Sequence, residues 1–141
     1  MCYDSARYAA AARFWAEALE ADPKLGDDRR TFHRYNAACA AALAAAGQGK
    51  DDPPPAADRA KLRAQALDWL RAERNAWAKI LDGGTQERNR AAPNLRHWQR
   101  DPDLAGLRDP AALAELPEAE REGWRQLWAD VGALLKRASP E

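Results

Sequence analysis

Apolar positions along this chain recur every three or four residues, which is the period of an α-helix. No segment alternates between apolar and polar positions as a half-buried strand does. The β-branched residues that strands favour are almost absent, and all of them are Thr31, Ile80, Thr85 and Val131. We therefore predict an all-α fold with about six helices.

Two helices are predicted before residue 48. The first covers about residues 5–21, and Asp22-Pro23 ends it because proline does not continue a helix. Its apolar face carries Tyr8, Ala11, Trp15, Ala18 and Leu19. The second begins near Asp27-Asp28, whose carboxylates suit the positive end of a helix dipole, and ends at Gly47. Its packing stripe carries Phe32, Tyr35, Cys39 and Leu43.

A proline-rich loop separates these helices from the rest of the chain. It covers residues 48–57, and a third helix with a broad apolar face follows at about residues 58–81. A fourth helical stretch, residues 85–99, contains Pro93. We expect a break or a kink there, because proline removes a backbone hydrogen bond and clashes with the preceding turn.

The C-terminal part is predicted to hold a short and a long helix. Two Asp-Pro steps predict turns around a short helix near residues 111–116. The long helix begins at Pro117, with glutamates in its first turn and Lys136 and Arg137 in its last, which matches the helix dipole. Its buried face is predicted to carry Trp124, Leu127, Trp128, Val131, Leu134 and Leu135.

The spacing of Ala11, Trp15, Ala18 and Pro23 resembles the second helix of a tetratricopeptide repeat. Alanines let neighbouring helices approach closely, the aromatic ring fills the gap, and the proline ends the helix. The segment 35–39 resembles the start of a further repeat. The resemblance implies a helical hairpin array within a single helical domain. We divide that domain, residues 1–138, into a repeat-like part (8–47), the proline-rich loop (48–57) and a helical tail (58–138).

The chain as a whole resembles the C-terminal helical tail of repeat-bearing bacterial serine/threonine kinases. The segments that carry this resemblance are residues 35–39, 101–109 and 124–131. None of the kinase motifs is present: the glycine-rich loop, HRD and DFG are all missing from the sequence. The resemblance therefore implies a scaffold beside an enzyme and no enzymatic activity in this chain.

The charge balance and the cysteine content argue against several classes of partner and ligand. The chain has 22 basic and 22 acidic residues, divided as 7 and 6 over residues 1–50 and as 15 and 16 over residues 51–141. Such a balance argues against nucleic acid or an anionic membrane as the main partner. Cys2 and Cys39 form no metal-binding pattern, so we expect no metal, no cofactor and a reducing cytoplasm. The first four residues do not begin a secretory signal.

No catalytic residue is expected either. His33 and Cys39 are six residues apart and do not share a helix face, so we interpret Cys39 as a small buried side chain and His33 as partly exposed. We interpret His97 as a surface or capping histidine. Of the six tryptophans, which are mostly placed at core spacing, Trp98 is predicted to be the one that is partly exposed, because charged and polar residues flank it.

The candidate partner site is a stripe along the second helix, formed by Arg29, His33, Asn36 and Ala40. The resemblance implies that this stripe lines a peptide-binding groove, where Asn36 meets a peptide backbone and Arg29 a carboxylate. The alternative is that the C-terminal helices cover the stripe. We accordingly predict a protein- or peptide-binding scaffold, with a purely structural cap of a longer repeat array as the alternative. An uncovered face on the first helix would also favour self-association.

Overall fold

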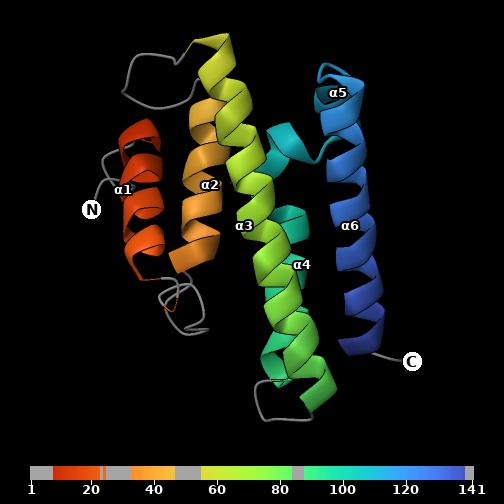
Figure 1. Ribbon diagram of the computed structural model, residues 1–141. Coiled ribbons are helices and arrows are strands. Elements are labelled where there is room, and N and C mark those ends of the chain that lie inside the picture. The colour runs from red at the N-terminus through yellow and green to blue at the C-terminus, as the bar shows by residue number, and fades with distance from the viewer. Residues whose placement is uncertain (1–7, 23, 25–32, 47–54, 84–87, 139–141) are drawn as a thin grey trace. The chain divides into compact units, whose positions relative to one another are not determined.

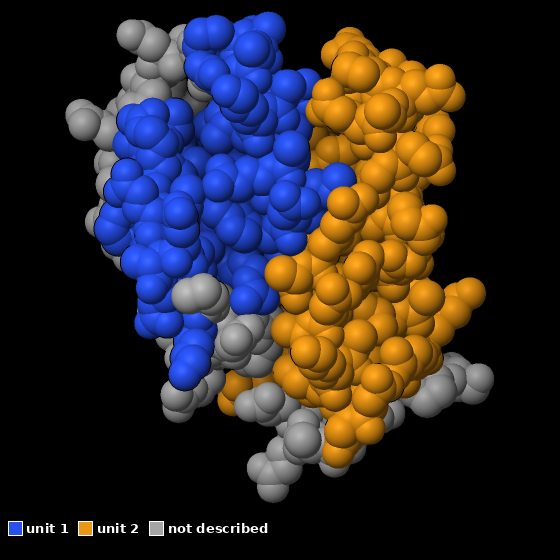
Figure 2. All heavy atoms as spheres, in the orientation of Figure 1, with its two compact units in different colours: residues 1–70 blue, residues 71–141 orange. Residues whose placement is uncertain are grey.

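The computed structural model describes residues 8–22, 24, 33–46, 55–83 and 88–138. Every regular element among these residues is a helix, which confirms the all-α prediction (Figure 1). The chain divides into two compact units, residues 1–70 (unit 1) and residues 71–141 (unit 2) (Figure 2). Among the described residues, no helix combines the length and the apolar character that a membrane-crossing segment needs.

The α-helical segments described in unit 1 run alternately in opposite directions (Figure 1). They are α1 (Tyr8–Ala21), α2 (His33–Ala45) and the first part, residues 56–70, of α3 (Ala56–Gly83). Helix α1 ends where the sequence predicts, and the Asp22 amide donates to the carbonyl oxygen of Ala18 at 3.0 Å. The predicted beginnings of the first two helices, and most of the loop 48–57, lie outside the described residues.

Helices α1 and α2 pack along each other through the face of α1 that the sequence predicts. The side chains of Ala11, Trp15 and Leu19 are buried, and they recur every four residues. The Trp15 ring lies against the ring of His33 at the start of α2, with 4.9 Å between the ring centroids. Trp15 therefore faces an adjoining helix, as the repeat-like spacing requires.

Helix α2 is buried on almost every side. Nine of its 13 residues are buried, and seven of the 13 are alanine. A helix that is apolar all round is a central helix, and alanine lets its neighbours approach from several directions because its side chain is short. The predicted one-sided stripe is therefore too narrow a description of α2, since Ala37, Ala40 and Ala41 are fully buried as well.

Unit 2 is a second group of antiparallel helices. It contains the second part, residues 71–83, of α3, followed by α4 (Arg88–Arg100), the 3₁₀-helix η2 (Pro102–Leu107), α5 (Pro110–Leu113) and α6 (Glu118–Ala138). Helices α4 and α6 pack against each other and run in opposite directions (Figure 1). Both Asp-Pro steps begin a helix, and the Asp101 carboxylate accepts a hydrogen bond from the Asp103 amide at 3.0 Å.

Helix α6 is held by an apolar stripe and by ion pairs. Its buried residues are Trp124, Leu127, Val131 and Leu134, all of them predicted, whereas Trp128 and Leu135, also predicted to be buried, are half-buried. Asp130, on the flank of this stripe, accepts hydrogen bonds from Arg74 Nη1 of α3 at 2.6 Å and from Gln126 Nε2 at 2.9 Å. Arg137 in the last turn pairs with Asp82 of α3. These contacts fasten α6 to the second part of α3.

The structure narrows one prediction for α4 and corrects another. The helix does not break at Pro93, which lies on its exposed side, and a kink there stays a prediction. Only the hydrogen bond to the carbonyl of Asn89 is lost there, and water can satisfy that exposed group. Trp98 is 2% exposed and not partly open. It continues the buried stripe of Ala91 and Leu95, because its charged sequence neighbours point in other directions around the helix.

Candidate functional site

Three of the four residues of the predicted peptide-binding stripe, His33, Asn36 and Ala40, lie in the described helix α2. Arg29 lies outside the described residues. His33 packs against Trp15, and Asn36 is half-buried. Ala40 is 0% exposed, so its side chain presents no surface to a ligand in this arrangement. The role of this stripe in partner binding stays a prediction.

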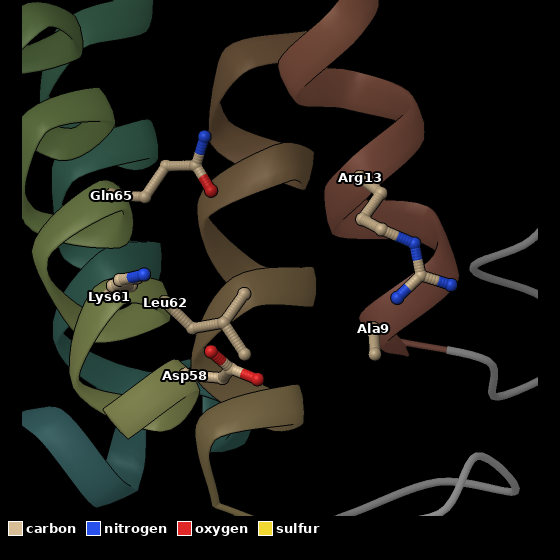
Figure 3. A pocket seen from close by; sticks show the side chains of 6 residues that line it. All are labelled: Ala9, Arg13, Asp58, Lys61, Leu62 and Gln65. Atoms are coloured by element: carbon tan, nitrogen blue, oxygen red, sulfur yellow. The ribbon is translucent and has the colours of Figure 1, made fainter. Parts of the chain in front are cut away.

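An open pocket lies elsewhere in unit 1, between α1 and the first three turns of α3. Its volume is about 250 Å³. It is lined by Ala9, Arg13, Asp58, Lys61, Leu62 and Gln65. In Figure 3, Asp58, Leu62 and Gln65 extend from α3 towards the side on which α1 lies, and Arg13 stands on α1. We call this feature the α1–α3 pocket.

Helical spacing brings these side chains together. Ala9 and Arg13 are four residues apart on α1 and so lie one turn above the other. The α3 residues follow the spacing i, i+3, i+4 and i+7, which places them on one face. Asp58 lies in the first turn of α3, where a carboxylate offsets the positive end of the helix dipole.

The pocket combines cationic walls with an apolar base. Arg13 and Lys61 are exposed and stand on different helices, and Asp58 is the one anionic side chain among the lining residues. Ala9 and Leu62 are half-buried and supply apolar surface. The Gln65 amide offers both a donor and an acceptor, as the backbone of an extended peptide requires. The arrangement suits an extended segment that carries carboxylates and small apolar side chains.

The residues considered for catalysis lie apart from this pocket. None of the side chains that line it is a histidine, cysteine, serine or threonine. Cys39 is buried in α2. The side chain of His97 in α4 is 61% exposed, and its Nε2 lies 3.2 Å from Asp101 Oδ2, which fits the predicted surface histidine. The side chains that line the pocket offer charges, a side-chain amide and apolar surface.

Unit 2 has a pocket of its own, with a volume of about 270 Å³. It is lined by Arg108, Pro110, Leu113, Arg125 and Trp128. Arg108 Nη1 donates to the carbonyl oxygens of Trp98 at 3.0 Å and Asp101 at 2.8 Å, and Trp128 Nε1 donates to that of Leu107 at 2.9 Å. These donors fasten η2 to α4 and α6, so we interpret the pocket as part of the packing of unit 2.

Reasoning from the sequence did not single out Arg13, Asp58, Lys61 or Gln65. The period of each helix does place these residues beside its buried stripe. The period does not reveal that the flank of α1 meets the flank of α3, because that depends on the angle at which each helix lies on α2. The polar stripe beside the buried stripe of each helix was the sequence signal that could have indicated these residues.

The residues that carry the tetratricopeptide-like spacing in α1 take part in helix packing. Trp15 is buried, and α1 lies along α2. Antiparallel helices with buried alanines occur in many all-α folds, so this packing is compatible with a repeat without identifying one. None of the protein-family models, curated proteins or solved structures compared with this chain matches it.

Proposed function

We propose that this chain is a non-catalytic protein-interaction domain of tetratricopeptide type, which holds an extended acidic segment of a partner protein in the α1–α3 pocket. The observation that carries the proposal is the placement of Arg13 and Lys61 on opposite walls of an open pocket with apolar surface between them. Opposed cations bind a chain that carries carboxylates on both of its sides.

The size and openness of the pocket favour a peptide over a small molecule. Pockets for small ligands are typically about 300–1,000 Å³ and bury most of the ligand. The α1–α3 pocket is smaller, and its charged side chains are exposed to solvent. An extended peptide needs only to seat one or two side chains while the rest of it runs over the surface between the helices.

The packing of α1 on α2 supports the repeat type of the proposal. In a stacked helical hairpin array, each helix buries its apolar face against its sequence neighbours. The burial of Ala11 and Trp15, together with the alternating directions of α1, α2 and α3, is what such an array requires.

Reversing the charge of both cationic walls tests the site. A fluorescein-labelled ten-residue peptide, in which glutamate alternates with alanine and leucine, serves as the probe in fluorescence anisotropy. We expect the double substitution Arg13→Glu and Lys61→Glu to weaken binding by roughly tenfold or more, because two attractive charges become repulsive. A lysine-containing version of the peptide should bind the unmodified chain more weakly.

The matched control reverses two exposed arginines of α4, through Arg90→Glu and Arg100→Glu. It makes the same change in net charge at residues that do not line the pocket, and we expect it to leave binding within about twofold of the unmodified chain. The proposed site is wrong if the two double variants weaken binding equally, or if the unmodified chain binds the acidic and the lysine-containing peptide alike.

A purely structural cap of a longer repeat array is the second candidate. The complete burial of Ala40 favours it, because that residue of the predicted groove is closed to ligands. A cap binds neither peptide, whereas the proposed domain binds the acidic one. A loss of binding on Asn36→Ala, with no effect of the Arg13 and Lys61 substitutions, would place the partner on the α2 stripe instead.

A further inference from the structure

Helix α1 exposes a large apolar side chain that plays no part in the α1–α3 pocket. Phe14 is 55% exposed, and it is the one exposed large hydrophobic residue among the described part of the chain. Its ring touches the ring of its neighbour Trp15, edge to face, with 5.2 Å between centroids. An exposed phenylalanine in the middle of a helix marks a candidate contact surface when its surroundings complement a partner.

The residues around Phe14 form a regular seam on α1. Ala10, Phe14, Glu17 and Ala21 follow the spacing i, i+4, i+7 and i+11, which is that of a helix–helix contact line. A small residue one turn before Phe14 and another two turns after it leave space for a second aromatic ring. A helix with the same seam therefore has the steric shape to pack here.

The charges beside this seam run against the dipole of α1. Arg13 lies in the N-terminal half, whereas Glu17 and Glu20 lie in the C-terminal half, and all three are exposed. A helix dipole favours acidic residues near the start and basic residues near the end. The first turn of α1 has no acidic residue and its last turn has no basic residue. Arg13 and Glu17 are four residues apart and attract each other within the helix, whereas Glu20 in the last turn opposes the dipole, and an antiparallel partner helix offsets this.

We propose that a second copy of this chain supplies that partner, with the two α1 helices packed antiparallel about a twofold axis. In that arrangement Arg13 of each copy faces Glu17 and Glu20 of the other, and the two dipoles oppose each other. The complementarity follows from the twofold axis itself, because the same positions provide both halves of every charge pair. In this register each Phe14 ring lies level with residues 16–19 of the other copy, one turn or less from its Ala21.

The contact surface is short. Fourteen residues of α-helix extend about 21 Å, and contacts below about 1,200 Å² are typical of weak complexes. We therefore expect association with a dissociation constant on the order of 10–500 μM, which places the transition within the range of analytical ultracentrifugation. Phe14→Ala should raise that constant at least tenfold, since interfaces depend on a few central aromatic anchors.

A charge-exchange experiment tests the orientation. One variant carries Arg13→Glu, and the other carries Glu17→Arg with Glu20→Arg. Each should be monomeric alone, because like charges then meet across the axis, whereas an equimolar mixture should associate about as strongly as the unmodified chain. Recovery in the mixture also shows that both variants are folded. Arg90→Glu on α4 is the control and should not change association.

Three results would overturn the proposal. They are a single monomeric species of the unmodified chain up to about 1 mM, association that Phe14→Ala leaves unchanged, and an equimolar mixture that stays monomeric. Arg13 also lines the α1–α3 pocket, so Phe14→Ala is the variant that separates the two proposals: it should weaken association and leave peptide binding unchanged, because Phe14 does not line the pocket.

Discussion

Replacing Trp124 by alanine is expected to lower the free energy of unfolding by about 3–5 kcal/mol. Trp124 is 1% exposed and begins the buried stripe of α6, which packs against α4. Truncation removes the transfer free energy of an indole ring and leaves a cavity that the rigid helices fill only in part. Because a domain is stable by only about 5–15 kcal/mol, a large share of the stability would be lost.

Urea denaturation followed by circular dichroism at 222 nm measures this loss, and the thermal midpoint should fall by roughly 10–20 °C. Phe14→Ala is the matched control, since it truncates an aromatic side chain that is exposed, and it should change stability by no more than about 0.5 kcal/mol. A loss below about 1 kcal/mol for Trp124→Ala would show that this tryptophan is not enclosed as described.

The second large effect is expected from enlarging an alanine of α2. Ala37 is fully buried and lies one turn after His33, whose ring contacts Trp15, so Ala37 faces α1. Leucine at this position would force α1 and α2 apart. We expect Ala37→Leu to lower the free energy of unfolding by about 1–3 kcal/mol, although leucine is more apolar than alanine.

Ala64→Leu is the control for this substitution. Ala64 lies on the exposed side of α3 in the same unit, so the same enlargement meets no neighbour and should be neutral within about 0.5 kcal/mol. Urea denaturation of both variants decides the comparison. If Ala37→Leu proves as stable as Ala64→Leu, the alanines of α2 are not the cause of the close approach of the helices.

The helices themselves could be predicted because their signals are local. Proline after α1, the Asp-Pro step before α5, and the order of charges in α6 act within one turn of the helix they begin or end. The burial of Trp15 was likewise predictable from the spacing of the apolar residues in α1. Predictions of this kind need no knowledge of which helices are neighbours.

The predictions that failed, and the features that were not predicted, depend on contacts between helices. Alanine occurs on both exposed and buried helix faces, so the sequence did not predict that α2 is buried on almost every side. Glu73 is a second case, because it is a carboxylate inside the buried stripe between Leu70 and Trp77, where an apolar pattern has no place for it. The α1–α3 pocket joins residues about 50 positions apart, as Arg13 and Lys61 show, and no spacing rule reaches that far.

The location of the bound peptide tests the proposed function most directly. The acidic peptide is titrated into the ¹⁵N-labelled chain, and backbone amide chemical shifts are followed by NMR. We predict that the largest changes occur at Ala9, Arg13, Asp58, Lys61, Leu62 and Gln65, in the two helices that flank the pocket. Changes confined to Asn36 and its neighbours on α2, or to the pocket around Trp128, would contradict the assignment of the α1–α3 pocket as the partner site.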